Sequence, residues 1–133
     1  MYTEQSLAKV ELRLGLLDAS RERLGRCLEL ARERQDRFGE ALVLRTLGEW
    51  QLAAGDAGSA RDPLERALSL WEALRLPLWR ARTLWDLAQV WETAGETGAA
   101  AGARAEAMRV FRESGAREAR ERETRDREAR ERA

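Results

Sequence analysis

The chain has 133 residues, enough for one domain or a short array of repeats but too few for a second hydrophobic core. Its 24 basic side chains balance 24 acidic ones, so no overall field would hold nucleic acid or an anionic membrane. The chain has no histidine, the commonest general base and the usual zinc ligand, and we expect no enzyme activity, no metal and no cofactor.

Composition also indicates the fold class and a compartment. Strong helix formers (Ala, Leu, Glu and Arg) dominate the chain, which predicts an all-α fold. No stretch approaches the roughly 18 uninterrupted apolar residues that a membrane span needs. Cys27 is the only cysteine, so no intrachain disulfide can form, and a cytoplasmic protein is the simplest expectation.

The sequence repeats with a period of 40 residues. Each repeat has a leucine followed by a small residue, then a glycine eight positions after the leucine. These leucines and glycines are Leu7, Leu47, Leu87, Gly15, Gly55 and Gly95. Apolar and small residues at spacings of three and four on both sides of each glycine predict two helices per repeat, with the glycine in the left-handed turn between them.

In chain order, we predict the first helix of each repeat (helix A) at about 2–14, 39–53 and 79–93. The second helix (helix B) is predicted at about 18–34, 57–74 and 97–114. Asp56 follows the second glycine, where an acid suits the start of the next helix. Pro63 removes a backbone donor within helix B, so we expect that helix to bend slightly or to begin later than its counterparts.

The C-terminal segment 116–133 departs from the repeat. Its only apolar residues are alanines, and Arg127 stands where a fourth repeat would need leucine. Acidic and basic residues at i,i+4 spacing, beginning with Glu118 and Arg122, support a marginal helix. We therefore predict a repeat domain over 1–115, with repeats at about 1–38, 39–78 and 79–115, and an Arg/Glu-rich solvated helix or tail over 116–133.

These residues resemble a known family. Leu47, Gly48, Gly55, Ala60 and Ala67 stand where the tetratricopeptide repeat has its consensus leucine, glycines and alanines. The resemblance implies a right-handed α-solenoid of three helix-turn-helix repeats. The period of 40 exceeds the usual 34 or so and is similar to a long-repeat subclass. Residues 45–49 (RTLGE) are also similar to the repeat region of large bacterial transcription regulators that carry an NTPase module.

The resemblance implies a protein-binding scaffold that receives a partner peptide or helix in a concave groove lined by helices A. Carried over position by position, the groove residues are Lys9, Arg13, Arg45, Glu49, Arg82, Trp85 and Gln89. The carboxylate clamp by which some members hold chaperone C-termini is disfavoured, because its positions hold Gln5, Thr46 and Asp86. We expect no acidic residue to lie in an apolar stripe where its pKa would rise.

Three alternatives stay open. Trp85 either faces the groove as a binding hot spot or packs between repeats. Instead of a partner groove, the chain could be a self-assembly module that forms a homodimer through an uncapped last helix containing Met108 and Phe111. Nucleic-acid binding by the arginine-rich segment is disfavoured, because acidic residues nearly balance basic ones there.

Overall fold

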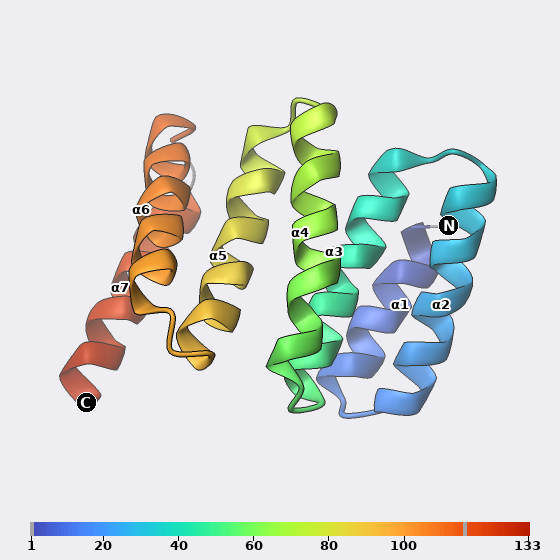
Figure 1. The fold of residues 1–133 in the computed structure, drawn as a ribbon, viewed down its shortest axis with the longest axis horizontal. Coiled ribbons are helices and arrows are strands. Elements are labelled where there is room, and N and C mark those ends of the chain that lie inside the picture. The colour runs from blue at the N-terminus through green and yellow to red at the C-terminus, as the bar shows by residue number, and fades with distance from the viewer. Residues whose placement is uncertain (1, 116) are drawn as a thin grey trace.

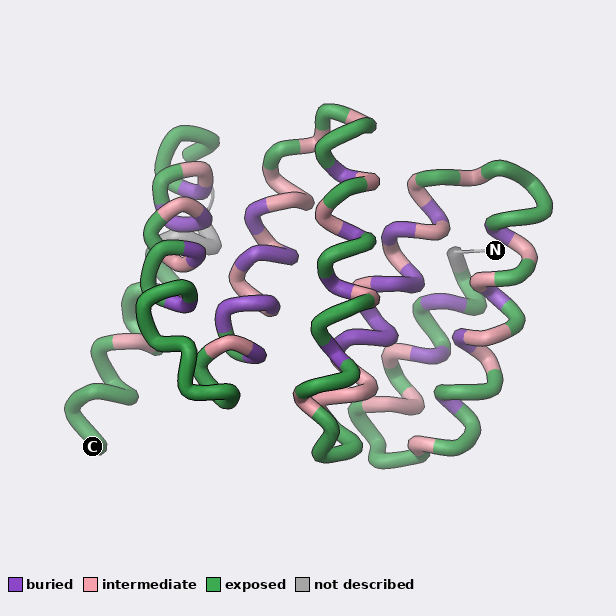
Figure 2. The backbone as a smooth tube through the Cα atoms, in the orientation of Figure 1, coloured by how far each residue is buried: buried purple, intermediate pink, exposed green. Residues whose placement is uncertain are grey.

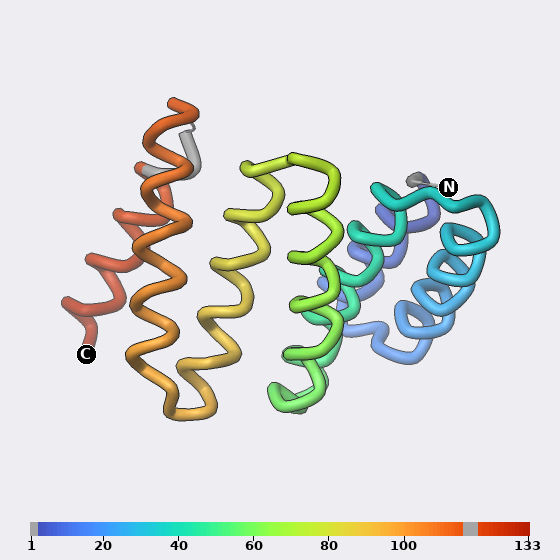
Figure 3. The backbone as a smooth tube through the Cα atoms, turned by 45° about the horizontal axis from the view of Figure 1, so that its top comes forward, coloured from blue at the N-terminus to red at the C-terminus, as the bar shows by residue number. Residues whose placement is uncertain are grey.

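The computed structural model describes residues 2–115 and 117–133, and the described residues form helices joined by short turns. The helices are α1 (Tyr2–Arg13), α2 (Leu17–Glu33), α3 (Arg37–Ala53), α4 (Ala57–Ala73), α5 (Pro77–Thr93), α6 (Thr97–Glu113) and α7 (Arg117–Arg132). Figures 1 and 3 show them as an elongated array that follows chain order, with α1 and α2 at one end and α6 and α7 at the other. Each helix packs on the next, and the A helices also touch, α1 on α3 and α3 on α5.

The predicted helices are present, with small differences at their starts. α3 and α5 begin two residues earlier than expected, at Arg37 and Pro77. Asp36 caps α3 by accepting a hydrogen bond from the Gly39 amide at 2.9 Å, and Pro77 occupies the first turn of α5, where its fixed φ suits a helix. Of the two effects expected of Pro63, a slight bend or a later start, the later start does not occur, because α4 begins at Ala57, 40 residues after α2.

Residues in the left-handed conformation end the helices, and they are glycines after some helices and larger residues after others. Gly15, Gly55 and Gly95 have φ between 79° and 83° in the turns after α1, α3 and α5, as the sequence predicts. The turns after α2 and α4 also use this conformation, but at Gln35 and Arg75, whose φ angles are 54° and 57°. A side chain is strained there, so glycine spacing alone does not reveal these two turns.

The core runs along the facing sides of the helices, where the buried segments lie in Figure 2. Small residues permit the close approach, and Gly48 of α3 is the extreme case, because a Cβ there would lie 2.5 Å from Cγ of the fully buried Leu64 on α4. Phe38, Trp71 and Trp79 form an aromatic cluster, with the two indole rings stacked at 5.2 Å between centroids. This cluster joins α3, α4 and α5.

α7 lies against α6 through long polar side chains. The Arg122 guanidinium stands 4.9 Å above the ring centroid of Trp85 and 5.4 Å from that of Phe111. Glu123 forms an ion pair with Arg112 of α6. The side chain of Glu118, for which an ion pair was predicted, lies outside the described residues. α7 is therefore a helix attached by charged and stacking contacts.

Candidate functional site

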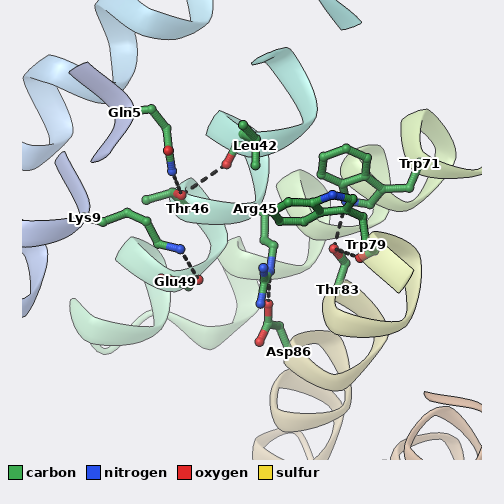
Figure 4. Close-up of polar contacts among 10 residues, drawn as sticks. All are labelled: Gln5, Lys9, Leu42, Arg45, Thr46, Glu49, Trp71, Trp79, Thr83 and Asp86. Carbon is green, nitrogen blue, oxygen red and sulfur yellow. Dashed lines mark hydrogen bonds and ion pairs between the residues drawn. The ribbon is translucent and has the colours of Figure 1, made fainter. Parts of the chain in front are cut away.

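The A helices are joined by polar contacts between side chains of neighbouring repeats (Figure 4). On α1, the Gln5 amide donates a buried hydrogen bond of 2.8 Å to the Thr46 hydroxyl of α3. That hydroxyl donates in turn to the Leu42 carbonyl at 3.1 Å, one turn back on its own helix. The hydrogen bond between Gln5 and Thr46 is therefore a buried polar contact that joins α1 to α3.

Two ion pairs lie among the same helices. Lys9 of α1 is 3.9 Å from Glu49 of α3, and the Nε of Arg45 on α3 donates to Asp86 of α5 at 2.6 Å. Lys9, Glu49 and Arg45 are three of the predicted groove residues, so the structure brings them together as internal pairs. Lys9 and Glu49 stand 40 positions apart, so a search for opposite charges one period apart would have found that pair. Arg45 and Asp86 stand 41 positions apart, so the same search would have missed theirs.

Glu49 corrects an expectation from the sequence. Burial raises the pKa of its carboxyl group, and the positive charges of Lys9, Arg45 and Arg13 oppose this shift. Asp86 adds to the rise through like-charge repulsion. The prediction that no acid would have a raised pKa is therefore wrong, since neighbouring A helices desolvate Glu49 while leaving its side chain 29% exposed.

The remaining charged and amide positions of the predicted groove are more open. Arg13 and Gln89 are exposed at the ends of α1 and α5. Arg82 is half-buried, with its guanidinium carbon 4.9 Å above the Trp79 ring, an attractive cation–π geometry. Arg13 belongs to α1 and Arg82 and Gln89 belong to α5, the A helices on either side of α3.

Trp85 lies at the junction of α5 with the last two helices. It is half-buried and packs on the α6 core, with its ring centroid 6.4 Å from that of Phe111. Two guanidinium groups approach its ring, Arg104 of α6 at 5.8 Å and Arg122 of α7 at 4.9 Å. These contacts match the packing alternative more closely than that of an open hot spot.

Sequence reasoning did not assign a structural role to Gln5, Thr46 and Asp86. It treated them as departures from a carboxylate clamp, whereas each completes a contact between A helices. Met108 and Phe111, expected at an uncapped end, are buried beside α7, with exposed fractions of 8% and 0%. Self-assembly through an open face containing these two residues is therefore not favoured.

The described residues offer neither a metal site nor a membrane-spanning element. Among them, no three Cys, Asp or Glu side chains gather in a way that could hold an ion. Within the same ranges, every helix is too short or too polar to cross a bilayer.

Comparison with known proteins agrees with the geometry. A search of curated proteins finds no match. The family model described as tetratricopeptide repeat matches residues 1–73, more than half of the chain. Repeats of this family generally mediate protein–protein interaction and are typically non-enzymatic scaffolds. The described helices form an array of pairs, and the family model matches α1 to α4. The chain therefore belongs to the tetratricopeptide repeat family.

Proposed function

We propose that this protein binds a peptide or helix of a partner protein along the face formed by α1, α3 and α5, as a regulatory domain or part of a larger regulator. The observation that carries this proposal is the row of polar contacts joining these three helices, from Gln5–Thr46 and Lys9–Glu49 to Arg45–Asp86. The contacts hold the helices at fixed spacing before a partner arrives, and such preorganisation lowers the entropic cost of binding.

The charge of this face favours an acidic partner segment. Four cationic side chains stand against two anionic ones on a chain whose formal net charge is zero. They are Lys9, Arg13, Arg45 and Arg82 against Glu49 and Asp86. A local positive excess steers acidic ligands and rejects basic ones. Acidic side chains of the partner would meet Arg13 and Arg82 at the borders of the row.

The regulatory setting rests on the sequence. The similarity of residues 45–49 to the repeats of bacterial transcription regulators supports a role in transcription control in the cytoplasm. A scaffold of this kind would act by holding a partner rather than by chemistry. Arginine on this face suits that task, because its planar guanidinium binds carboxylates with defined geometry.

The test is affinity capture from extracts of the source cells, followed by titration of the purified partner in low and high salt. We expect Arg13→Glu with Gln89→Glu to abolish capture, because both positions are exposed on the proposed face and the change reverses its charge. Binding to the wild type should also weaken as salt rises.

The matched control is Arg26→Glu with Gln35→Glu, which makes the same change of charge at exposed positions on α2 and in the turn after it. Both variants are first shown to keep the helical content and melting temperature of the wild type. A partner that binds the two variants equally well would place its site elsewhere and overturn the proposal.

A further inference from the structure

One kind of junction recurs at one edge of the array, where the end of an A helix lies beside the start of the preceding B helix (Figure 1). In the first junction, between α3 and α2, the Trp50 indole occupies this place. Its Nε1 donates a hydrogen bond of 2.8 Å to the Leu17 carbonyl. The Arg21 guanidinium carbon stands 5.7 Å from the centroid of the same ring, within the range of a cation–π contact. An aromatic ring therefore closes the first junction.

The second junction, one period later between α5 and α4, has smaller side chains. Val90 stands where the first junction has tryptophan, and Ala57 stands where it has leucine. Arg61 keeps the place of the arginine. These three residues help to line a cavity of about 340 Å³, here named the α4–α5 cavity. Pockets that hold ligands begin at about 300 Å³, so this volume is sufficient for one aromatic side chain.

The lining of the α4–α5 cavity suits an aromatic ring. Val90 is buried, and the half-buried Trp91 packs against the same apolar cluster. Arg61 forms ion pairs with Glu65 at 2.9 Å and with Glu96 at 3.8 Å. The N–H groups that make these pairs lie in the plane of the guanidinium, so its flat face remains available to stack on a ring. The cavity therefore combines an apolar wall with a partly exposed cation.

The third junction, between α7 and α6, is also open but has a different lining. Its cavity has a volume of about 640 Å³. Arg130 lines it at the position of Val90, and Ala101 lines it at the position of Arg61. Arg104 lies in the same wall, so a ring placed there would remove charged groups from water, which is unfavourable. Of the three junctions, the second is therefore the one that is both open and suited to a ring.

We propose that the α4–α5 cavity binds a tryptophan side chain of a partner protein in the way that Trp50 occupies the first junction. The partner's indole N–H donates to the Ala57 carbonyl, which has a second lone pair beyond any bond within the helix. The ring lies on Val90, with the guanidinium of Arg61 above it. The first junction thus shows the geometry that the partner completes in the second.

The ring comes from outside this chain. None of the five tryptophans of the protein is exposed, so a second copy does not supply it. Tryptophan is enriched among the residues that anchor protein–protein interfaces in pockets. Repeats of this family generally mediate such interactions. The proposal does not depend on the row of polar contacts that joins α1, α3 and α5.

NMR titration of the isotope-labelled full chain with N-acetyltryptophan amide, which mimics a tryptophan within a peptide chain, tests the proposal. We expect saturable shifts confined to amide signals around the cavity, such as those of Gly58 and Ala94. N-acetylleucine amide, which lacks the ring and the indole N–H, should cause much smaller shifts. Arg61→Gln should weaken binding about two- to fivefold, as expected for loss of a partly exposed cation–π contact. Arg21→Gln, the same change at the equivalent exposed position of α2, is the matched control and should bind like the wild type.

Val90→Trp gives a second readout, because it places in α5 the residue that α3 has at Trp50 and fills the cavity from within. The variant should stay folded and should lose the shifts caused by the tryptophan amide. The comparison of Arg61→Gln with Arg21→Gln does not require this variant to fold.

Several outcomes would overturn the proposal. They are equal shifts with the two amides, equal affinities of Arg61→Gln and Arg21→Gln, and undiminished binding to a folded Val90→Trp protein. The absence of saturable shifts at the cavity would do the same. Tighter binding of free tryptophan than of its blocked amide would also contradict it, because the site would then serve a small molecule.

Discussion

At the scale of single residues, the packing of α3 on α4 depends on the missing side chain of Gly48. A methyl group there would lie 2.5 and 2.6 Å from Cγ and Cδ2 of Leu64, which is fully buried and cannot move aside easily. We expect Gly48→Ala to lower the free energy of unfolding by about 1–3 kcal/mol in urea titrations. Gly102→Ala on α6, where a Cβ meets nothing within 4 Å, should instead raise it by about 0.5–1 kcal/mol. Equal effects of the two changes would contradict this account.

Arg75 tests the strain in the turn between α4 and α5. Its φ of 57° costs an ordinary side chain roughly 1–2 kcal/mol, whereas glycine adopts that angle at the expense of about 0.5–1 kcal/mol of chain entropy. Arg75→Gly should therefore raise the melting temperature, measured by circular dichroism. Arg66→Gly, at an exposed interior position of α4, should lower it. A lower melting temperature for Arg75→Gly would show that the turn is not strained.

At the scale of elements, α7 should be the least stable helix. None of its described side chains is buried, and it is held by Arg122 above two aromatic rings and by the ion pair of Glu123. A backbone amide exchanges when its helix opens locally, and the free energy of that opening depends on the contacts that hold the helix. We therefore expect α7 amides to exchange with deuterium far faster than those of α4. Mass spectrometry of peptic fragments measures this. Protection of α7 equal to that of α4 would mean that the polar contacts hold it as firmly as a core.

The elements also show what the sequence can predict. The helices followed from apolar spacing and from Gly15, Gly55 and Gly95, because each of these signals is local. The turns at Gln35 and Arg75 carry no such signal, since neither residue type favours φ above zero. The pairing of Arg45 with Asp86 depends on how far α5 is rotated about its axis relative to α3. The two residues stand 41 positions apart, one more than the period, so the repeat alone does not identify the partner. The place of Trp85 depends on α7, whose composition predicted only a solvated segment.

At the scale of the whole molecule, pH acts on the array in two opposite directions. Burial raises the pKa of Glu49 at the junction of α1 and α3. The folded chain therefore holds that proton more tightly than the unfolded chain, so the contribution of Glu49 to stability is greatest below the unfolded pKa and is lost as pH rises through the folded pKa. Hydrogen bonds from the Ser59 hydroxyl and amide lower the pKa of Asp56. Its contribution is present above the unfolded pKa and is lost as pH falls through the folded pKa.

Comparing variants separates these two effects. We expect the unfolding free energy of the wild type, relative to that of Glu49→Gln, to increase as pH falls through the raised pKa of Glu49. Relative to Asp56→Asn, the same quantity should decrease on acidification, because the wild type loses its charged helix cap. Urea titrations over the acidic range measure both differences. If the two free-energy differences change with pH in opposite directions, desolvation governs the junction of α1 with α3 and capping governs the start of α4. Parallel slopes would mean that Glu49 is solvated and that the contact between α1 and α3 is looser than the structure shows.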